Sequence, residues 1–333
     1  MLKVGLLGAG RIAGVHATAI SGHPGSTLAA VSDINTSAAE KIAAQYGAEV
    51  RSTDAILGDK TIDAVLIATS TDTHSDLIEK ATAAGKAVLC EKPVDLSLER
   101  ARACQKVVAK AGRPVMIGFN RRFDPNFAAL KKAVDAGEIG KPELLSITSF
   151  DPAPPPVAYI KVSGGLFRDM MIHDFDMANF IMGAAPATVT AVGSSIVDPE
   201  IGSVGDVDTA VVTLTYADGR IAVIKNSRRA VYGYDQRLEL LGSEGLLQAQ
   251  NMLENTVVKS TTQGVTGAKP TYFFLERYMP AYAAEWAAFV DAVNGDKSLP
   301  VTLDDGVAAL AMAEAATLSV KTGAPVLLES MIG

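Results

Sequence analysis

Short apolar runs alternate with amphipathic segments over the first 118 residues of the chain. The run at residues 63–69 has apolar side chains on both faces, as a buried parallel strand does. The expected strands cover residues 2–7, 28–32, 63–69, 87–90 and 115–118. The expected helices cover residues 12–20, 37–46, 74–84 and 98–111, and the last three are followed by Gly47, Gly85 and Gly112. Repeated strand–helix units with short connections predict a doubly wound parallel sheet.

The pattern changes after residue 122, where strand signals follow one another in hairpin style. Asp218-Gly219 is a typical hairpin turn, and the prolines between residues 152 and 156 predict a stiff loop. The expected strands cover residues 144–150, 210–216, 221–226, 237–241 and 246–250, and the expected helices cover residues 126–136, 167–182, 282–293 and 307–320. The chain is therefore expected to be an α/β protein of two domains. Residues 1–120 would form the parallel domain, and residues 121–333 an α+β domain with a mostly antiparallel, open sheet.

The composition narrows the classes of partner. The net charge is −7 and no run of lysine or arginine exceeds two, so a nucleic-acid partner is not expected. The apolar stretches fall short of the roughly 20 residues that span a bilayer, so a membrane partner is not expected either. The N-terminal segment passes directly into a glycine loop, which indicates a first strand rather than an export signal. Cys90 and Cys104 form no spaced framework, which favours free thiols in a reducing cytoplasm.

A glycine motif lies between the first expected strand and the first expected helix. Gly8-Ala9-Gly10-Arg11-Ile12-Ala13 fits the pattern G-x-G-x-x-G/A. The first glycine permits a tight turn, the second lets the backbone approach a pyrophosphate, and the helix N-terminus faces the negative charge. An ordinary strand-to-helix turn is the alternative, but this position favours a Rossmann dinucleotide site. The expected cofactor contacts in this loop are Gly8, Gly10, Arg11 and Ile12.

Asp33 follows the second strand, where a carboxylate binds the ribose hydroxyls of adenosine. The same carboxylate repels the 2′-phosphate of NADP, and residues 34–37 contain no arginine to offset that repulsion. NAD is therefore the predicted cofactor. Comparable Michaelis constants for NAD and NADP would contradict this prediction.

Polar residues follow the strand at residues 63–69, at the carboxyl edge of the sheet, where ligands of such folds bind. Thr69 and Ser70 are expected to lie near the cofactor. His74 has two interpretations, since it could approach the cofactor or cap the following helix. The sequence leaves both open.

Oxidation of a secondary alcohol requires a base for the hydroxyl proton and a charge beside the forming carbonyl. His16 and His23 are interpreted as solvated or packing residues. His173 lies four residues after Asp169 on an expected helix, so both side chains share one face, where a carboxylate raises the basicity of an imidazole. A surface pair is the alternative. The preceding Gly164-Gly165, which allows a close backbone approach to a ligand, favours the functional interpretation.

Lys92 offers the required charge at the end of the fifth strand, directly before Pro93. A lysine held against a cofactor can hydrogen-bond a substrate hydroxyl and stabilise developing negative charge. A solvated loop lysine is the alternative, and spacing alone does not exclude it.

A metal site is not expected. His173, Asp174 and Asp176 are possible ligands, but no second histidine or cysteine stands nearby at ligand spacing. NAD is the one cofactor that the sequence predicts.

At these residues the chain resembles the glucose–fructose oxidoreductase/inositol dehydrogenase (Gfo/Idh/MocA) family over essentially its whole length. The glycine motif, Glu91-Lys92-Pro93 and the stretch from Gly164 to His173 match the family in order and spacing. The resemblance implies that Lys92 contacts the reacting hydroxyl, that His173 is the acid/base and that Asp169 assists it. It also implies that Glu91 and Lys92 lie at the cofactor and that the Lys92-Pro93 bond is cis. A homotetramer that pairs through the open sheet of the second domain is a further implication.

Finer motifs resemble the myo-inositol 2-dehydrogenase branch of that family. They lie at residues 118–124, 151–154 and 228–237. The resemblance implies that Asn120, Arg121, Asp151 and Tyr234 surround a polyol, whose hydroxyls need several convergent donors and acceptors. Tyr232 and Tyr234, two apart on an expected strand, would project to the same face, and one of them could serve only in packing.

The resulting hypothesis is an NAD-dependent oxidoreductase that oxidises myo-inositol to its 2-ketone. The same chemistry on another polyol, such as scyllo-inositol or an aldose, is the nearest alternative. An NAD-using glycosidase and a non-catalytic sensor on the same fold are two further alternatives. The joint presence of Lys92, Asp169 and His173 argues against the sensor.

Overall fold

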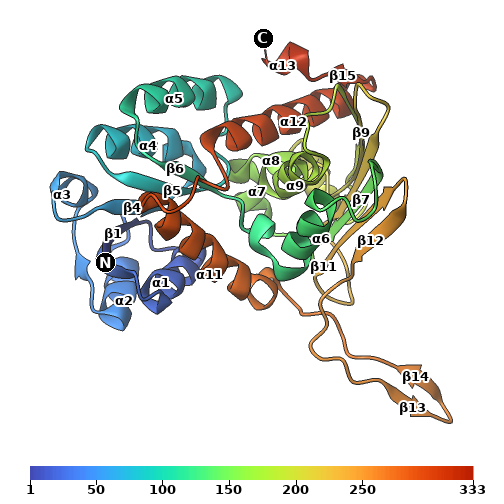
Figure 1. Cartoon of the computed structure of the whole chain (residues 1–333), viewed down its shortest axis with the longest axis horizontal. Coiled ribbons are helices and arrows are strands. Elements are labelled where there is room, and N and C mark those ends of the chain that lie inside the picture. The colour runs from blue at the N-terminus through green and yellow to red at the C-terminus, as the bar shows by residue number, and fades with distance from the viewer. Residues whose placement is uncertain (333) are drawn as a thin grey trace. The chain divides into compact units, whose positions relative to one another are not determined.

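The computed structural model describes residues 1–332, which form two compact units (Figure 1). The first unit comprises Met1–Phe123 and Met279–Leu310, and the second comprises Asp124–Tyr278 and the residues from Ala311 onward. Each unit contains its own main sheet. Among the described residues, no helix has both the length and the apolar character needed to cross a membrane.

The first unit is built on a six-stranded sheet in the order β3-β2-β1-β4-β5-β6, in which all neighbouring strands are parallel. The strands are β1 Leu2–Leu7, β2 Ser26–Ser32, β3 Glu49–Val50, β4 Ala64–Ile67, β5 Ala87–Glu91 and β6 Val115–Gly118. The helices are α1 Arg11–Gly22, α2 Thr36–Tyr46, α3 Thr53–Gly58, α4 His74–Ala83 and α5 Leu98–Ala111, with short 3-10 helices η1 Thr71–Thr73 and η2 Asn120–Phe123. This strand order is that of a Rossmann fold, and it confirms the predicted doubly wound sheet.

Local signals set the ends of these helices. The Ser97 hydroxyl accepts a hydrogen bond from the Arg100 N–H at 3.3 Å and so satisfies a donor in the first turn of α5. Gly47 and Gly112 follow α2 and α5 with φ of 70° and 62°, the left-handed conformation that glycine adopts most readily. The predicted ends of these two helices are therefore confirmed.

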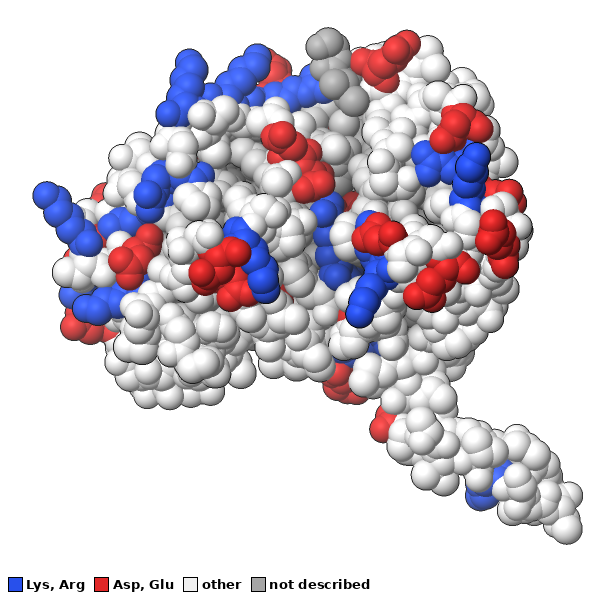
Figure 2. Space-filling view, viewed as in Figure 1, with Lys and Arg blue, Asp and Glu red and all other residues white. Residues whose placement is uncertain are grey.

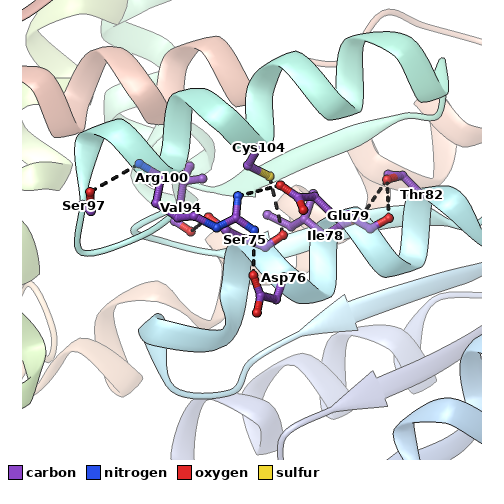
Figure 3. Close-up of polar contacts among 9 residues, drawn as sticks. All are labelled: Ser75, Asp76, Ile78, Glu79, Thr82, Val94, Ser97, Arg100 and Cys104. Atoms are coloured by element: carbon purple, nitrogen blue, oxygen red, sulfur yellow. Dashed lines mark hydrogen bonds and ion pairs between the residues drawn. The ribbon is translucent and has the colours of Figure 1, made fainter.

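Helices α4 and α5 pack against each other (Figure 3). The Arg100 guanidinium on α5 donates to Glu79 and Asp76 on α4, each at 2.6 Å. The Ser75 hydroxyl donates to the Val94 carbonyl at 3.2 Å. This last bond connects the start of α4 to the loop that follows β5.

The second unit is built on a seven-stranded sheet in the order β12-β11-β7-β10-β9-β8-β15, which is antiparallel except for the β7–β10 pair. The strands are β7 Pro142–Phe150, β8 Thr188–Ser194, β9 Thr209–Thr215, β10 Ile221–Ser227, β11 Asp235–Gly242, β12 Gly245–Ala249 and β15 Val326–Leu327. The helices are α6 Pro125–Asp135, α7 Val157–Ser163, α8 Gly165–Asp169, α9 Ile172–Met182, α10 Pro199–Ser203 and α13 Glu329–Ile332. Helices α6 and α9 pack against the sheet and against each other, and a hairpin of β13 Lys259–Thr261 and β14 Gly264–Thr266 extends from this unit (Figure 1). The predicted mostly antiparallel sheet is confirmed.

Two long helices, α11 Phe274–Val293 and α12 Leu303–Thr322, run from one unit into the other. Part of each belongs to the first unit, where the buried Trp286 donates from its indole Nε1 to the Ser26 hydroxyl at 2.8 Å. The sequence predicted a domain boundary at residue 120, with all of residues 121–333 in the second domain. The observed division differs, because Met279–Leu310 belong to the first unit. The apolar faces of these late helices complete the core of the first unit.

Candidate active site

The loop between β1 and α1 has a geometry that requires glycine. Gly8 has a φ of 102°, and a Cβ at this position would lie 2.3 Å from the Ala68 carbonyl oxygen. A Cβ at Gly10 would meet no atom within 4 Å, so the space beside the first turn of α1 is open. In the described structure no side chain caps this helix, whose first turn contains Arg11 and Ile12. The main-chain N–H groups of that turn can therefore receive an anionic ligand.

Asp33 lies beside this loop. One carboxylate oxygen, Oδ2, accepts a hydrogen bond from the Ala9 N–H, and Oδ1 accepts one from the Asn35 N–H, each at 2.6 Å. Each oxygen has a further lone pair, so the fixed carboxylate can also accept from ribose hydroxyls.

The polar residues after β4 are joined to the loop after β5 through His74. The ring of His74 is buried, with Nδ1 2.8 Å from the Pro93 carbonyl oxygen and Nε2 3.2 Å from the Thr69 carbonyl oxygen. Burial lowers the pKa of the imidazole, so the ring is neutral and the shorter contact assigns its proton to Nδ1. The Thr69 and Thr73 hydroxyls lie 2.7 Å apart, while Ser70 is exposed. The His74 side chain therefore attaches the start of α4 to the loop after β5 and does not cap α4.

Glu91, the last residue of β5, is a buried carboxylate. Its Oε1 lies 2.7 Å from His16 Nε2, and its Oε2 accepts a hydrogen bond from the Lys92 N–H at 3.3 Å. Burial alone would raise the pKa of Glu91, but the hydrogen bond from His16 and the charge of Lys92 keep the pKa below its ordinary value. The Lys92-Pro93 peptide bond is cis, as the resemblance implied. His16 is thus a buried partner of Glu91 and not a solvated residue.

Asn120 and Arg121 belong to η2 and are buried. Among the described residues, the Asn120 amide nitrogen has no hydrogen-bond partner. Arg122 fastens η2 to the start of α12 through an ion pair with Asp305 at 2.9 Å and a hydrogen bond to the Pro300 carbonyl at 3.0 Å. A buried donor without a partner costs about 1–3 kcal/mol, which a ligand oxygen at Asn120 could offset.

In the second unit, Asp169 ends α8 and His173 lies in the first turn of α9. The expectation of one continuous helix over residues 167–182 is therefore wrong. The Met170 and Met171 N–H groups both donate to the Leu166 carbonyl, at 3.0 Å and 2.9 Å. This shared acceptor shifts the hydrogen-bond register between the two helices, so simple helical spacing does not describe Asp169 and His173.

Two residues that the sequence did not single out contact Asp169. The Tyr159 hydroxyl donates to Asp169 Oδ1 at 3.0 Å, and Arg228 Nη2 lies 3.5 Å from Oδ2. The Arg228 side chain is 1% exposed, so it places a buried positive charge beside the carboxylate. Tyr159 lies on α7, a helix that the sequence did not predict because prolines directly precede it. Arg228 begins the motif at residues 228–237, but the sequence indicated no role for it beside Asp169.

The paired glycines before α8 approach another part of the chain. Gly165 has a φ of 80°, and a Cβ there would lie 2.5 Å from Asp206 Oδ1. That carboxylate accepts a hydrogen bond from the Leu166 N–H at 3.0 Å. At Gly165 the close approach is to Asp206.

The residue after His173 anchors the start of α9. Asp174 is fully buried and accepts hydrogen bonds from the Ser149 hydroxyl at 2.6 Å and the Asn226 amide at 2.8 Å. These bonds attach the first turn of α9 to β7 and β10, and so fix the main chain at His173. No group of three or more histidine, cysteine, aspartate or glutamate side chains within the described part of the chain could hold a metal ion.

Asp151 and Tyr234, the remaining residues expected at a substrate, also lie in the second unit. Asp151 follows β7 and is half-buried. Tyr234 is buried, and its ring lies edge-on to that of Tyr278 with the ring centroids 5.9 Å apart. Tyr232 and Tyr234 precede β11, and Gly233 between them has a φ of 128°. The expectation that these tyrosines share one face of a strand is therefore wrong, because strand alternation does not apply there.

Two family models match the chain. The oxidoreductase family with an NAD-binding Rossmann fold matches residues 2–119, and the GFO/IDH/MocA C-terminal domain matches residues 127–248. The inositol 2-dehydrogenase of Rhizobium meliloti (strain 1021) is 52% identical over 319 residues, which are 96% of this chain and 97% of the relative. The chain belongs to the GFO/IDH/MocA oxidoreductase family.

Further similarities lie within the GFO/IDH/MocA family. The myo-inositol 2-dehydrogenase of Thermotoga maritima is 46% identical over 334 residues and 100% of each chain. The scyllo-inositol dehydrogenase of Lactobacillus casei, solved with bound NAD(H) and scyllo-inositol, is 30% identical, with a TM-score of 0.91 over 99% of each chain. The predicted family is confirmed, and NAD is the cofactor of this oxidoreductase.

The described residues fit that cofactor. The tight turn at Gly8, the open space at Gly10 and the uncapped N-terminus of α1 suit a pyrophosphate. Asp33 lies next to that turn with acceptor capacity for a ribose. The carboxyl ends of the parallel strands β1, β4 and β5 bring the glycine loop, Thr69 and Lys92 to one edge of the sheet.

Proposed function

We propose that this GFO/IDH/MocA oxidoreductase is an NAD-dependent inositol 2-dehydrogenase that oxidises myo-inositol to 2-keto-myo-inositol. The observation that carries the proposal is the identity of 52% and 46%, over nearly the whole chain, to two proteins named for this activity. A lysine, a carboxylate and an imidazole at Lys92, Asp169 and His173 supply the groups that such an oxidation needs.

Each reacting residue has a distinct task in this proposal. His173 accepts the proton of the substrate hydroxyl at an imidazole nitrogen, and Asp169 supports the imidazole. Lys92 donates a hydrogen bond from Nζ to the hydroxyl oxygen and stabilises the negative charge that develops there. Tyr159 and Arg228 hold the Asp169 carboxylate. When bound, NAD supplies the hydride acceptor.

The residues proposed to hold NAD line the carboxyl edge of the first sheet. They are Gly8, Gly10, Arg11, Ile12, Asp33, Thr69, Ser70, His74, Glu91 and Lys92. The residues proposed to bind the polyol are Asn120, Arg121, Asp151 and Tyr234. The buried, unsatisfied amide nitrogen of Asn120 supports its assignment as a donor to a substrate hydroxyl.

The proposal is tested by NADH absorbance with purified protein, NAD and either myo-inositol, scyllo-inositol or glucose. We expect strong NADH formation with myo-inositol, at a rate that rises from acidic toward alkaline pH, because imidazole must be neutral to accept a proton and its ordinary pKa is about 6.5. Turnover of scyllo-inositol alone would keep the chemistry and replace the substrate. No turnover with any of the three would contradict the proposal, and tightly retained NAD would then favour a glycosidase.

We also propose a homotetramer that pairs through the open face of the second sheet. Leu246, Leu241, Leu144 and Ile221 are direct neighbours across β12, β11, β7 and β10. All four side chains are between 39% and 49% exposed. A continuous apolar row of this kind is typical of a protein–protein interface.

A cytoplasmic location is proposed from the cysteines. Cys90 and Cys104 are both free and buried. Burial raises the pKa of both thiols, so neither is reactive. Unreactive free thiols without disulfides are typical of reducing compartments.

A further inference from the structure

Two buried histidines outside the proposed chemical step bind the residues on either side of Lys92. His16 contacts the Glu91 carboxylate at 2.7 Å, and His74 contacts the Pro93 carbonyl oxygen at 2.8 Å. Both rings are 1% exposed. We infer that His16 and His74 are positioning residues, which fix the main chain at Lys92 and so direct its ammonium group toward the reacting hydroxyl. This inference rests on the proposed function.

On the first side, His16 reaches Glu91 from α1. The ionised Glu91 carboxylate accepts one hydrogen bond from His16 Nε2 and one from the Lys92 N–H at 3.3 Å. The ring of Tyr282 packs edge-on to His16, with centroids 5.3 Å apart, and restricts rotation of the imidazole. A buried carboxylate with charge-assisted bonds cannot reorient without a large cost, so the Lys92 main chain is held in place.

On the second side, His74 reaches the Pro93 carbonyl from the start of α4. Its Nδ1–H donates to Pro93, while Nε2 lies 3.2 Å from the Thr69 carbonyl. The neighbouring Ser75 hydroxyl donates to the next carbonyl, that of Val94, at 3.2 Å (Figure 3). Two successive main-chain carbonyls after Lys92 are thus bound by one helix end.

The precision of this attachment matters because Lys92 reaches the reacting centre through a long, flexible side chain. A misplacement of about 1 Å at a reacting group can reduce the rate about 100-fold. Aromatic or aliphatic side chains could fill the same two spaces, but only a directed donor fixes Glu91 and Pro93. The test must therefore separate the hydrogen bond from the packing volume.

Replacing each histidine by Asn or Gln separates the effect of the hydrogen bond from that of the packing volume. The amide nitrogen of Gln lies near the place of a histidine Nε2, and that of Asn lies near the place of Nδ1. The matched variants are His16→Gln and His74→Asn, and the crossed variants are His16→Asn and His74→Gln. His23→Asn, in the loop after α1, is the control because its amide oxygen can still accept the Gly25 N–H.

The first measurement is kcat with myo-inositol, alongside NAD affinity from protein fluorescence and folding from thermal denaturation. We expect kcat to fall about 100-fold in the crossed variants and to stay within about tenfold in the matched ones, with NAD affinity little changed in the two His16 variants. Crossed variants that lose only thermal stability, or matched variants as slow as the crossed ones, would overturn the inference.

The second measurement does not depend on activity. The protein is treated with a water-soluble reagent that acylates amines. Peptide mass spectrometry then compares the rate of acylation of Lys92 with that of the exposed Lys106. We expect the ratio of the two rates to change severalfold in the crossed variants and to return in the matched ones. An unchanged ratio in the crossed variants would contradict positioning. If the wild-type chain oxidises no polyol, the proposed function fails, and this ratio alone decides the role of the histidines.

Discussion

Lys92 supplies the positive charge proposed beside the reacting hydroxyl. In Lys92→Ala, we expect kcat to fall by about 100-fold to 1,000-fold, because charge developing on the substrate oxygen loses its donor. NAD should still bind, since the glycine loop and Asp33 remain and only the contact of Lys92 is lost. NADH absorbance and a fluorescence titration with NAD measure the two effects. Lys106→Ala, on the exposed side of α5, is the control and should behave as wild type. Near-full turnover in Lys92→Ala would remove this lysine from the mechanism.

Arg228 is the buried charge beside Asp169. In Arg228→Gln, we expect the free energy of unfolding to fall by about 3–5 kcal/mol or kcat to fall sharply. The reason is that the Asp169 carboxylate, in a partly buried site, loses its charged partner. The neighbouring exposed Arg229 is the matched control, and Arg229→Gln should change neither quantity appreciably. Urea denaturation and initial rates measure both. Equal behaviour of the two variants would show that Arg228 does not support Asp169.

Sequence could predict individual residues where a motif fixes the local backbone. Gly8 follows from the turn that it makes, and Lys92 from its place at the end of a strand. The partners of these groups could not be predicted, because they come from distant segments. His16 lies 75 residues from Glu91, and Arg228 lies 59 residues from Asp169. Only folding brings such pairs within hydrogen-bond distance.

At the scale of elements, Gly165 determines how α8 begins. A side chain there would face both an unfavourable positive φ of 80° and a collision with Asp206. Gly183 after α9 has a similar φ of 66° but no atom within 4 Å of an added Cβ. We therefore expect Gly165→Ala to lower the free energy of unfolding by about 2–3 kcal/mol, and Gly183→Ala by about 1 kcal/mol. Urea denaturation compares them, and equal losses would mean that contact with Asp206 adds nothing.

The elements themselves were predictable where hydrophobic period and caps agreed, as for α2 and α5. The interruption between α8 and α9 was not, because residues 167–182 have helical composition throughout. At the interruption, the Leu166 carbonyl accepts hydrogen bonds from both the Met170 and the Met171 N–H groups. This shared acceptor is a main-chain effect that leaves no period in the sequence.

The ion pair of Arg122 and Asp305 attaches η2 to α12. Burial alone would raise the pKa of Asp305, but the charge of Arg122 and hydrogen bonds from Arg122 and Thr302 keep the pKa below its ordinary value. A lowered folded-state pKa gives stability above the unfolded pKa that is lost as the pH falls through the folded one. We therefore expect Asp305→Asn to destabilise the protein by about 1 kcal/mol at pH 7, and the difference to shrink below about pH 4.

Urea denaturation at several pH values measures this effect. Asp304→Asn is the control, because its amide oxygen can still accept the hydrogen bond from Gln105. A difference between Asp305→Asn and wild type that stays constant from pH 7 to the acid limit would assign the effect to something other than the charge.

At the scale of the whole molecule, two of the exposed apolar regions of the second unit bear on its assembly. One is the leucine and isoleucine row on the open sheet, and the other is the hairpin of β13 and β14. Residues 255–268 carry a single charged side chain, Lys259 (Figure 2). Val257, Val258 and Val265 are each more than 60% exposed. An isolated two-stranded hairpin is marginally stable in water, so packing of this hairpin against another copy of the chain fits the proposed homotetramer.

The open sheet gives the sharper test of that assembly. Leu241 on β11 is paired with Leu144 and Leu246, so a lysine in its place would put a charge in the middle of the apolar row. We expect Leu241→Lys to sediment as a smaller species than wild type in analytical ultracentrifugation, because an unpaired charge opposes burial of the row against a second copy. Val107→Lys on α5 is the matched control, since Val107 and Leu241 are both 43% exposed. A wild-type monomer would contradict the homotetramer, whereas a tetramer that tolerates Leu241→Lys would place the contact away from this face and leave the hairpin as the surface to alter next.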